Sequence, residues 1–189
     1  MTKKYILHHN RRSIRLKNYD YSQPGLYFIT ICTQDKTNLF GKITDNNMIL
    51  NIAGEMVDKI WLEIPKIFSN SKLHEYVIMP NHFHAIVEIT HSIGAEMDSD
   101  GAEMDSAPTG GVNGNVSLPK IVQTFKRYTT IEYIKMVKRH LLPSFERRIW
   151  QRNYYEHIIR DEESYLKIVE YIINNPSKWT EDKYYTQPF

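Results

Sequence analysis

The sequence predicts an α+β fold, a ferredoxin-like antiparallel sheet with helices on one face and an extra C-terminal helix. The main observation is the order of the apolar patterns, which alternate between extended and helical spacing as strand, helix, strand, strand, helix, strand and helix. A second is the composition, because 189 residues that are 41% hydrophobic and 24% charged are typical of one globular domain. We therefore expect residues 1–189 to form a single domain.

The first half of the chain provides most of the sheet. Residues 25–33 begin at a Pro-Gly pair and are rich in β-branched and aromatic side chains, which indicates a strand. From Ile52 to Phe68 the apolar side chains recur at helical spacing. We expect strands at 25–33, 73–79 and 83–89, a hairpin that ends in 48–50, and a helix at 52–68.

The second half contributes two helices and one strand. The Ser-Leu-Pro sequence at 117–119 is typical of a helix N-terminus, and this helix should run to about Leu141. A strand dense in aromatic residues is expected at 150–159, and the last helix should begin at Asp161 and end before Pro176. On a helical wheel the apolar residues of this last helix gather on one arc, the expected core face: Tyr165, Leu166, Val169, Ile172 and Ile173.

Two segments differ in composition from the rest of the domain. Residues 1–20 form a basic N-terminal segment, in which lysines and arginines gather with no acidic residue among the first 17. Residues 93–116 contain a tandem repeat, 94–99 and 101–106, that is small and acidic. Because such a segment cannot bury enough apolar surface to order itself, we expect 93–116 to be a flexible loop without a catalytic role.

Two histidines lie two residues apart at the start of an apolar segment. In an extended chain residues i and i+2 project from one face, so His82 and His84 should point the same way while Phe83 points into the opposite layer. Two adjacent imidazoles make half of a metal site. The alternative is a pair of surface histidines on an edge strand, and only further residues can decide between the two.

Tyr171 and Asn175 of the last helix favour the metal site. Tyr171 lies almost opposite the expected core face, and Asn175 follows one turn later on the same row. A tyrosine on the polar face is either an ordinary surface residue or a reactive group. Combined with the histidines, an amide ligand from Asn175 and a phenol one turn away are compatible with phosphoryl transfer. Tyr154 and Tyr155 instead fall in a strand, where packing or stacking is the default role.

Four segments together resemble a known family, the single-tyrosine transposases with a His-hydrophobic-His motif, and most closely its REP-associated branch. The segments are Met79-Pro80-Asn81-His82-Phe83-His84, Gly25–Thr30, Trp150-Gln151-Arg152 and Tyr171–Pro176. Family members cut single-stranded DNA next to hairpins, with a divalent ion and one tyrosine. The resemblance implies that His82 and His84 bind Mg²⁺ or Mn²⁺ and that Asn175 is the third ligand. It also implies that Tyr171, on a catalytic last helix, is the nucleophile and forms a 5′-phosphotyrosine intermediate.

Basic and aromatic residues predict contacts with nucleic acid, although the net charge of +2 is uninformative by itself. The expected partner is single-stranded or hairpin DNA, with no membrane contact, and the protein should be a monomer or a homodimer. A single cysteine and the absence of an apolar run of about 20 residues favour a cytoplasmic protein. The residues expected to touch DNA are Arg11, Arg12, Arg15, Lys17, Lys126, Arg127, Trp150 and Arg152.

Two other functional classes stay open. A non-catalytic nucleic-acid-binding module of ferredoxin-like fold would also show basic clusters and aromatic strands. A zinc hydrolase could use the two histidines, but no third histidine or carboxylate stands at a recognisable spacing. Covalent attachment of the protein to a labelled single strand would separate a strand transferase from both classes.

Overall fold

A computed structural model describes residues 19–91 and 116–186. Four of the expected DNA-binding residues lie outside these ranges: Arg11, Arg12, Arg15 and Lys17. The expected flexible loop also lies outside them, except for Val116. Among the helices of the described ranges, none combines the length and the apolar character that a membrane crossing requires.

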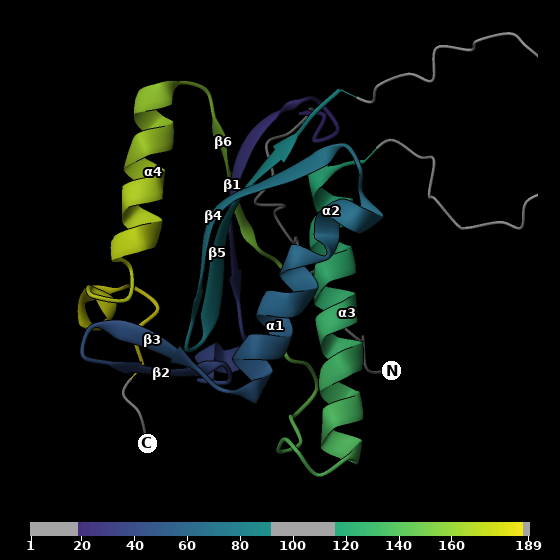
Figure 1. Cartoon of the computed structure of the whole chain (residues 1–189), viewed down its shortest axis with the longest axis vertical. Helices are drawn as coiled ribbons and strands as arrows, with labels where there is room; N and C mark the ends of the chain where they lie inside the picture. The colour runs from purple at the N-terminus through teal and green to yellow at the C-terminus, as the bar shows by residue number, and fades with distance from the viewer. Residues whose placement is uncertain (1–18, 92–115, 187–189) are drawn as a thin grey trace, which may run out of the picture.

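A four-stranded antiparallel sheet forms the centre of the molecule (Figure 1). Its strands are β1 (Gly25–Cys32), β4 (Ser71–Met79), β5 (His82–Ile89) and β6 (Tyr155–Ile159), in the order β4-β5-β1-β6. Helix α1 (Ile52–Leu62) connects β1 to β4, and α3 (Leu118–Lys138) connects β5 to β6. This order and connectivity are those of the ferredoxin-like fold, so the predicted fold is confirmed.

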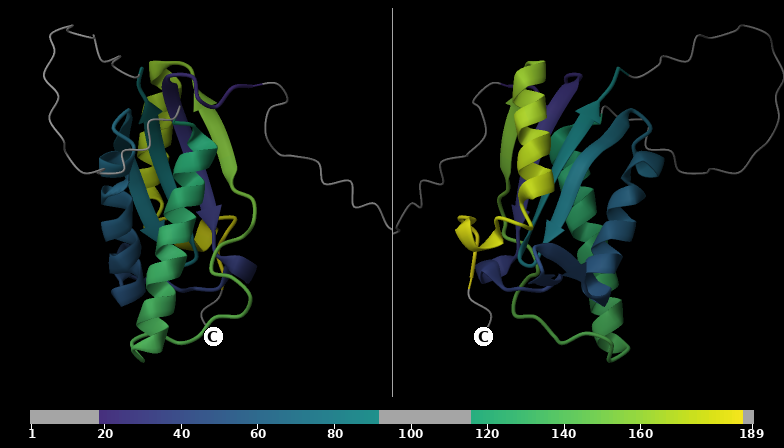
Figure 2. Two further views of the ribbon diagram at one scale, coloured as in Figure 1. Left: turned by 90° about the vertical axis from the view of Figure 1, so that its right-hand side faces the viewer. Right: turned by 60° about the vertical axis from the view of Figure 1, so that its left-hand side comes forward.

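The sheet has helices on both faces. Helices α1 and α3 pack on one face, and the extra helix α4 (Glu162–Asn174) covers the other (Figure 2). The larger core lies on the α1 and α3 side, where the rings of Trp61, Phe83 and Phe125 pack with centroids 4.8 to 5.1 Å apart. Ile86 of β5 packs on the other side, beneath Ile172 of α4. Because side chains alternate along a strand, the even-numbered residues of β5 face α4.

The connection between β1 and β4 contains a hairpin, as expected, and a broken helix. The hairpin consists of β2 (Gly41–Thr44) and β3 (Asn47–Leu50) and pairs outside the main sheet. The helix expected at 52–68 is two helices, α1 and the short α2 (Ile64–Ile67). Pro65 explains the break, because it has no N–H to donate and its ring clashes with the carbonyl one turn earlier.

Helix α4 packs on the sheet through Tyr165, Val169 and Ile172 as expected, but its core face is shifted toward Ile168. The residues that pack there are Tyr165, Ile168, Val169 and Ile172. The prediction that Leu166 and Ile173 belong to the core face is wrong, since these side chains are 57% and 59% exposed. The rotation brings Tyr171 from the expected solvent face to the edge of the interface, where its hydroxyl meets the buried His84. A polar partner satisfies that imidazole, which an aliphatic side chain could not do.

Candidate metal and nucleophile site

Both histidines of the motif are buried on the α4 face of the sheet. Strand β5 lies between β4 and β1, and the exposed fractions of His82 and His84 are 0% and 1%. Phe83 points into the opposite core, as expected. The alternative of two surface histidines on an edge strand is therefore wrong.

Asn81 fixes the orientation and the tautomer of His82. The Asn81 amide nitrogen donates to the backbone carbonyls of Lys36 and Tyr184, at 3.1 and 2.9 Å. The amide oxygen then accepts a hydrogen bond from His82 Nδ1, at 2.9 Å. Because the proton sits on Nδ1, Nε2 presents a lone pair, and this buried atom has no hydrogen-bond partner among the residues that the structure describes. Such an arrangement is how proteins orient a metal-binding imidazole.

His84 is held between Thr30 and Tyr171. Its Nδ1 lies 2.8 Å from Thr30 Oγ1 on the neighbouring strand β1, and its Nε2 lies 3.1 Å from the Tyr171 hydroxyl. The Tyr171 hydroxyl also donates to Asp182 Oδ2, at 3.3 Å. With that proton committed to the carboxylate, His84 Nε2 donates to the phenol and Thr30 donates to Nδ1. A hydroxyl can equally accept a hydrogen bond, so Thr30 also supports the tautomer in which Nε2 offers a lone pair.

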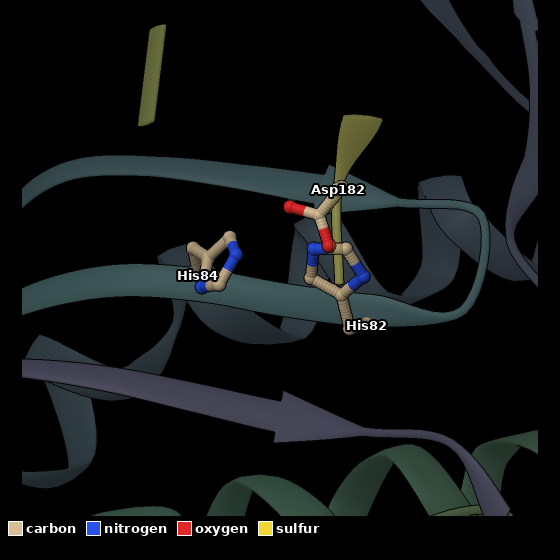
Figure 3. A group of neighbouring side chains, drawn as sticks. All are labelled: His82, His84 and Asp182. Atoms are coloured by element: carbon tan, nitrogen blue, oxygen red, sulfur yellow. The ribbon is translucent and has the colours of Figure 1, made fainter. Parts of the chain in front are cut away.

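Asp182 brings a carboxylate to the two histidines. It follows the short 3-10 helix η2 (Trp179–Glu181) in the C-terminal segment, and Figure 3 shows its carboxylate beside the two imidazoles. One ligand atom each from His82, His84 and Asp182 lie within 4.8 Å of one another. Asp182 was not among the residues expected at the site, since it is distant from the histidines in sequence and joins them only in the folded chain. No sequence signal marked this residue, because it lies in a polar stretch without periodicity.

Asn175, the third ligand that the family resemblance implies, lies next to this group. Its side chain is 2% exposed, and its amide nitrogen donates to Asp182 Oδ2 at 3.0 Å. Its amide oxygen has no hydrogen-bond partner in the described part of the chain. A buried carbonyl oxygen without a hydrogen-bond partner lowers the stability of the fold. His82 Nε2 is unsatisfied in the same way. The two orphaned atoms, both good metal ligands, indicate that this set fits a cation.

Burial sets the protonation of the group. It lowers the pKa of His82, although the charge of Asp182 and then the nearby Asn175 side chain, which both favour the protonated ring, oppose the shift. Burial and then the adjacent His82 lower the pKa of His84 well below its ordinary value. Both imidazoles are therefore neutral near pH 7, in the form that binds metals. The three side chains could hold a metal ion, and imidazole and carboxylate together suit several divalent ions.

Tyr171 stands at the rim of the group with its ring against both Phe28 and His84, which stack on each other. The ring centroids lie 6.1 and 5.1 Å from those of Phe28 and His84, and both contacts are edge-on. Burial, and next the charge of Asp182, raise the pKa of the phenol well above its ordinary value. Tyr171 is still 40% exposed, so a residue whose hydroxyl lies close to the ligand group also reaches solvent.

The described residues expected to bind DNA fall into two classes. Arg127 and Arg152 are exposed. Lys126 instead donates to the backbone carbonyls of Gln151, Arg152 and Asn153, at 3.0 to 3.4 Å. Trp150 is only 4% exposed, packs in the larger core and donates to Thr129 Oγ1 at 2.8 Å. The expectation that Trp150 touches DNA is therefore wrong for this structure, since the indole is enclosed.

Comparisons with known proteins give relatives in sequence and in structure. An uncharacterized protein of Haemophilus influenzae strain Rd is 43% identical over 187 residues, which cover 98% of this chain and 99% of the relative. A protein of the same strain, named provisionally as a REP-associated tyrosine transposase, is 25% identical over 166 residues, 86% of this chain and 77% of that protein. No protein-family model matches the chain.

A solved structure extends the likeness to the fold. It is that of a REP-associated tyrosine transposase bound to a REP hairpin, with a TM-score of 0.52 at 16% identity, covering 87% of this chain and 73% of that one. At this identity the structural match shows the fold alone. The resemblance that the motifs indicated is confirmed: the chain is similar in sequence to a protein provisionally named as a REP-associated tyrosine transposase and shares the fold of a solved REP-associated tyrosine transposase.

Proposed function

We propose that the protein is a metal-dependent single-stranded DNA endonuclease and strand transferase that acts beside DNA hairpins. The observation that carries this proposal is the position of the Tyr171 hydroxyl. It lies 3.1 Å from His84 Nε2 and 3.3 Å from Asp182 Oδ2, both part of a group of side chains that could hold a cation. A nucleophile beside a Lewis-acid site is what cleavage of a phosphodiester requires.

His82, His84 and Asp182 are the metal ligands in this proposal. Asn175, whose free amide oxygen faces the same group, either supplies a fourth ligand atom or only positions Asp182 through its amide nitrogen. A divalent ion such as Mg²⁺ or Mn²⁺ would supply Lewis-acid chemistry there, by neutralising charge on the scissile phosphate. His82 and His84 take part as neutral imidazoles, which their lowered pKa values favour.

Tyr171 performs the chemical step. Its oxygen attacks phosphorus, a phenol–phosphorus bond forms and the bond to the 3′-oxygen breaks, so the 5′ end stays attached to the enzyme and the departing 3′-oxygen takes up a proton to become a hydroxyl. The raised pKa keeps the resting phenol protonated, and Asp182 accepts the phenol proton through the carboxylate oxygen that the metal does not use. One phosphate ester replaces another, so a 3′-hydroxyl can reverse the step and rejoin a strand without an external energy source.

Hairpin DNA with a single-stranded flank is the proposed substrate. The solved structure of similar fold is bound to a REP hairpin, and the provisional name of the second relative refers to the same family. Arg127 and Arg152 are exposed cations available to the phosphate backbone. The biological process would be DNA transposition or the processing of repeat elements, by a monomer or a homodimer.

A metal-dependent hydrolase is the second candidate, and Asp182 is the observation that favours it. Two histidines and a carboxylate are a common ligand set of hydrolytic zinc sites, in which a water attacks. In such an enzyme Tyr171 would be dispensable for cleavage, whereas the strand transferase depends on it.

The test is a cleavage assay on a hairpin with a single-stranded flank, labelled at either end and resolved under denaturing conditions with Mn²⁺ present. The proposal predicts that the 3′-terminal label becomes attached to the protein and that the 5′-terminal label leaves on a shortened strand. Tyr171→Phe should abolish both products and keep DNA binding, while the matched variants Tyr154→Phe and Tyr155→Phe should retain them. Cleavage without attachment would instead indicate the hydrolase, and binding without cleavage the non-catalytic module.

A further inference from the structure

An open cavity of about 340 Å³ lies beside His84 and Tyr171 on the sheet surface. Phe28 and Thr30 of β1 and Tyr155 of β6 line its sheet side, and Lys183 of the C-terminal segment lines its rim. Its size is at the low end for cavities that hold small ligands, so it suits one nucleotide unit rather than a longer stretch of strand.

Tyr155 gives the cavity an aromatic wall. Its side chain is 44% exposed, although it stands on the sheet that carries the buried histidines. Phe28 supports the ring from below, edge-on with centroids 6.4 Å apart, and is itself only 8% exposed. A ring supported on one side and exposed on the other is a platform for stacking, and every nucleobase has a face that can use it.

Lys183 places a positive charge at the same cavity. Its ammonium lies 5.6 Å from the Tyr155 ring centroid and 4.9 Å from that of Tyr184. Its backbone is held where it is because its carbonyl accepts a hydrogen bond from Lys36 Nζ at 2.9 Å. Within residues 19–91 and 116–186, the contacts of this ammonium are the weak ones of a cation with aromatic rings, so it is available to an anion.

We propose that this cavity binds the unpaired nucleotide next to the scissile phosphate, with its base stacked on Tyr155 and its own phosphate paired with the Lys183 ammonium. The inference rests on the proposed function, because the cavity shares Tyr171 and His84 with the reaction site. Glu181 and Asp182 also line the cavity, and their charges oppose a phosphate. Stacking therefore supplies most of the affinity, and Lys183 offsets the local negative charge.

The test combines removal of single bases from the DNA with removal of the Tyr155 ring from the protein. Affinity is measured by fluorescence anisotropy in the Tyr171→Phe background, for a hairpin whose flank carries one abasic site, moved one position at a time. We expect one position at which base removal weakens binding by about 5- to 100-fold, the range that one stacked base provides. Tyr155→Leu should weaken binding of the intact strand to the same degree, and removal of the base at that position should then have no further effect. Tyr155→Phe should keep both the affinity for the intact strand and the effect of base removal.

Two further variants sharpen the test. Tyr128→Leu removes a ring of similar exposure, 41%, from α3 on the other face of the sheet, and should leave the abasic profile unchanged. Lys183→Ala should keep the abasic sensitivity but reduce the slope of log affinity against log salt by about 0.7, the value of one single-strand phosphate contact. Lys66→Ala, which removes an exposed lysine of α2, should leave the slope unchanged.

The possible outcomes distinguish failure of the proposed nucleotide site from failure of the proposed function. If Tyr155→Leu keeps full sensitivity at every flank position while the wild type still forms the covalent adduct, the nucleotide site is refuted and the proposed function stands. Coupling between Tyr155 and one base without any adduct would support the site in a non-catalytic binding module. If no flanked hairpin binds at all, both proposals are refuted.

Discussion

Removal of the Tyr171 hydroxyl should strengthen the binding of a divalent cation, not weaken it. In the metal-free arrangement the phenol is hydrogen-bonded to His84 Nε2 and Asp182 Oδ2, and both residues belong to the group that could hold a cation. A cation and the phenol therefore compete for these two side chains. Tyr171→Phe removes the phenol from both of them before the metal arrives, leaves the Asn175 hydrogen bond to Asp182 Oδ2 in place, and keeps the ring against Phe28.

The size of the effect follows from the two hydrogen bonds. At 3.1 and 3.3 Å both are longer than a strong charge-assisted bond of about 2.7 to 2.9 Å, and the phenol is 40% exposed to competing water. We therefore take the low end of the usual range, about 0.5 to 1 kcal/mol for the pair. This difference corresponds to an affinity for Mn²⁺ about two- to fivefold higher in the variant.

Calorimetric titration of the metal-free protein with Mn²⁺ measures this directly. Tyr155→Phe is the matched control, because Tyr155 lines the same cavity but is not one of the three residues that could hold the metal. The double variant His82→Ala/His84→Ala should show no specific binding. A lower affinity in Tyr171→Phe than in the wild type would refute the competition, because the phenol would then be a ligand or a support for the metal.

Other predictions concern stability and the orientation of the ligands. The lowered pKa values of His82 and His84 mean that, below the ordinary value of about 6.5, the unfolded chain binds protons that the folded chain does not, so stability is lost as pH falls. In urea unfolding with EDTA, the free energy of unfolding should be independent of these histidines above pH 7.5 and should be lower at pH 5. If His82→Asn/His84→Asn loses as much stability between these pH values as the wild type, the loss belongs to other groups. Asn81→Ala should weaken Mn²⁺ binding about 10- to 100-fold, because His82 loses the acceptor that orients it; an unchanged calorimetric affinity would show that the strand alone orients the ring. Trp150→Phe should lower the free energy of unfolding by about 1 to 3 kcal/mol through lost packing and the lost bond to Thr129, with DNA affinity unchanged in anisotropy measurements of the folded variant. A loss of DNA affinity in this variant at unchanged stability would instead indicate that Trp150 contacts DNA.

Local patterns in the sequence determined the sheet, the helices and the common direction of His82 and His84. The two-residue period of a strand depends only on the backbone, so the side on which Phe83 and the histidines lie could be predicted without knowing any partner. The order of the elements was enough for the ferredoxin-like fold. Pro65 was visible in the sequence, but whether a proline ends a helix or only bends it depends on the packing around it.

The tertiary structure alone decided which residues surround the histidines. Asp182 belongs to a segment without periodicity, and long-range hydrogen bonds hold that segment in place, among them those from Asn81 to the Tyr184 carbonyl and from Lys36 to the Lys183 carbonyl. Such contacts join residues about a hundred or more positions apart, and no local pattern encodes them. The rotation of α4 has the same cause. A helical wheel counts apolar side chains, whereas the helix settles where buried polar groups also find partners, and this places Tyr171 against His84.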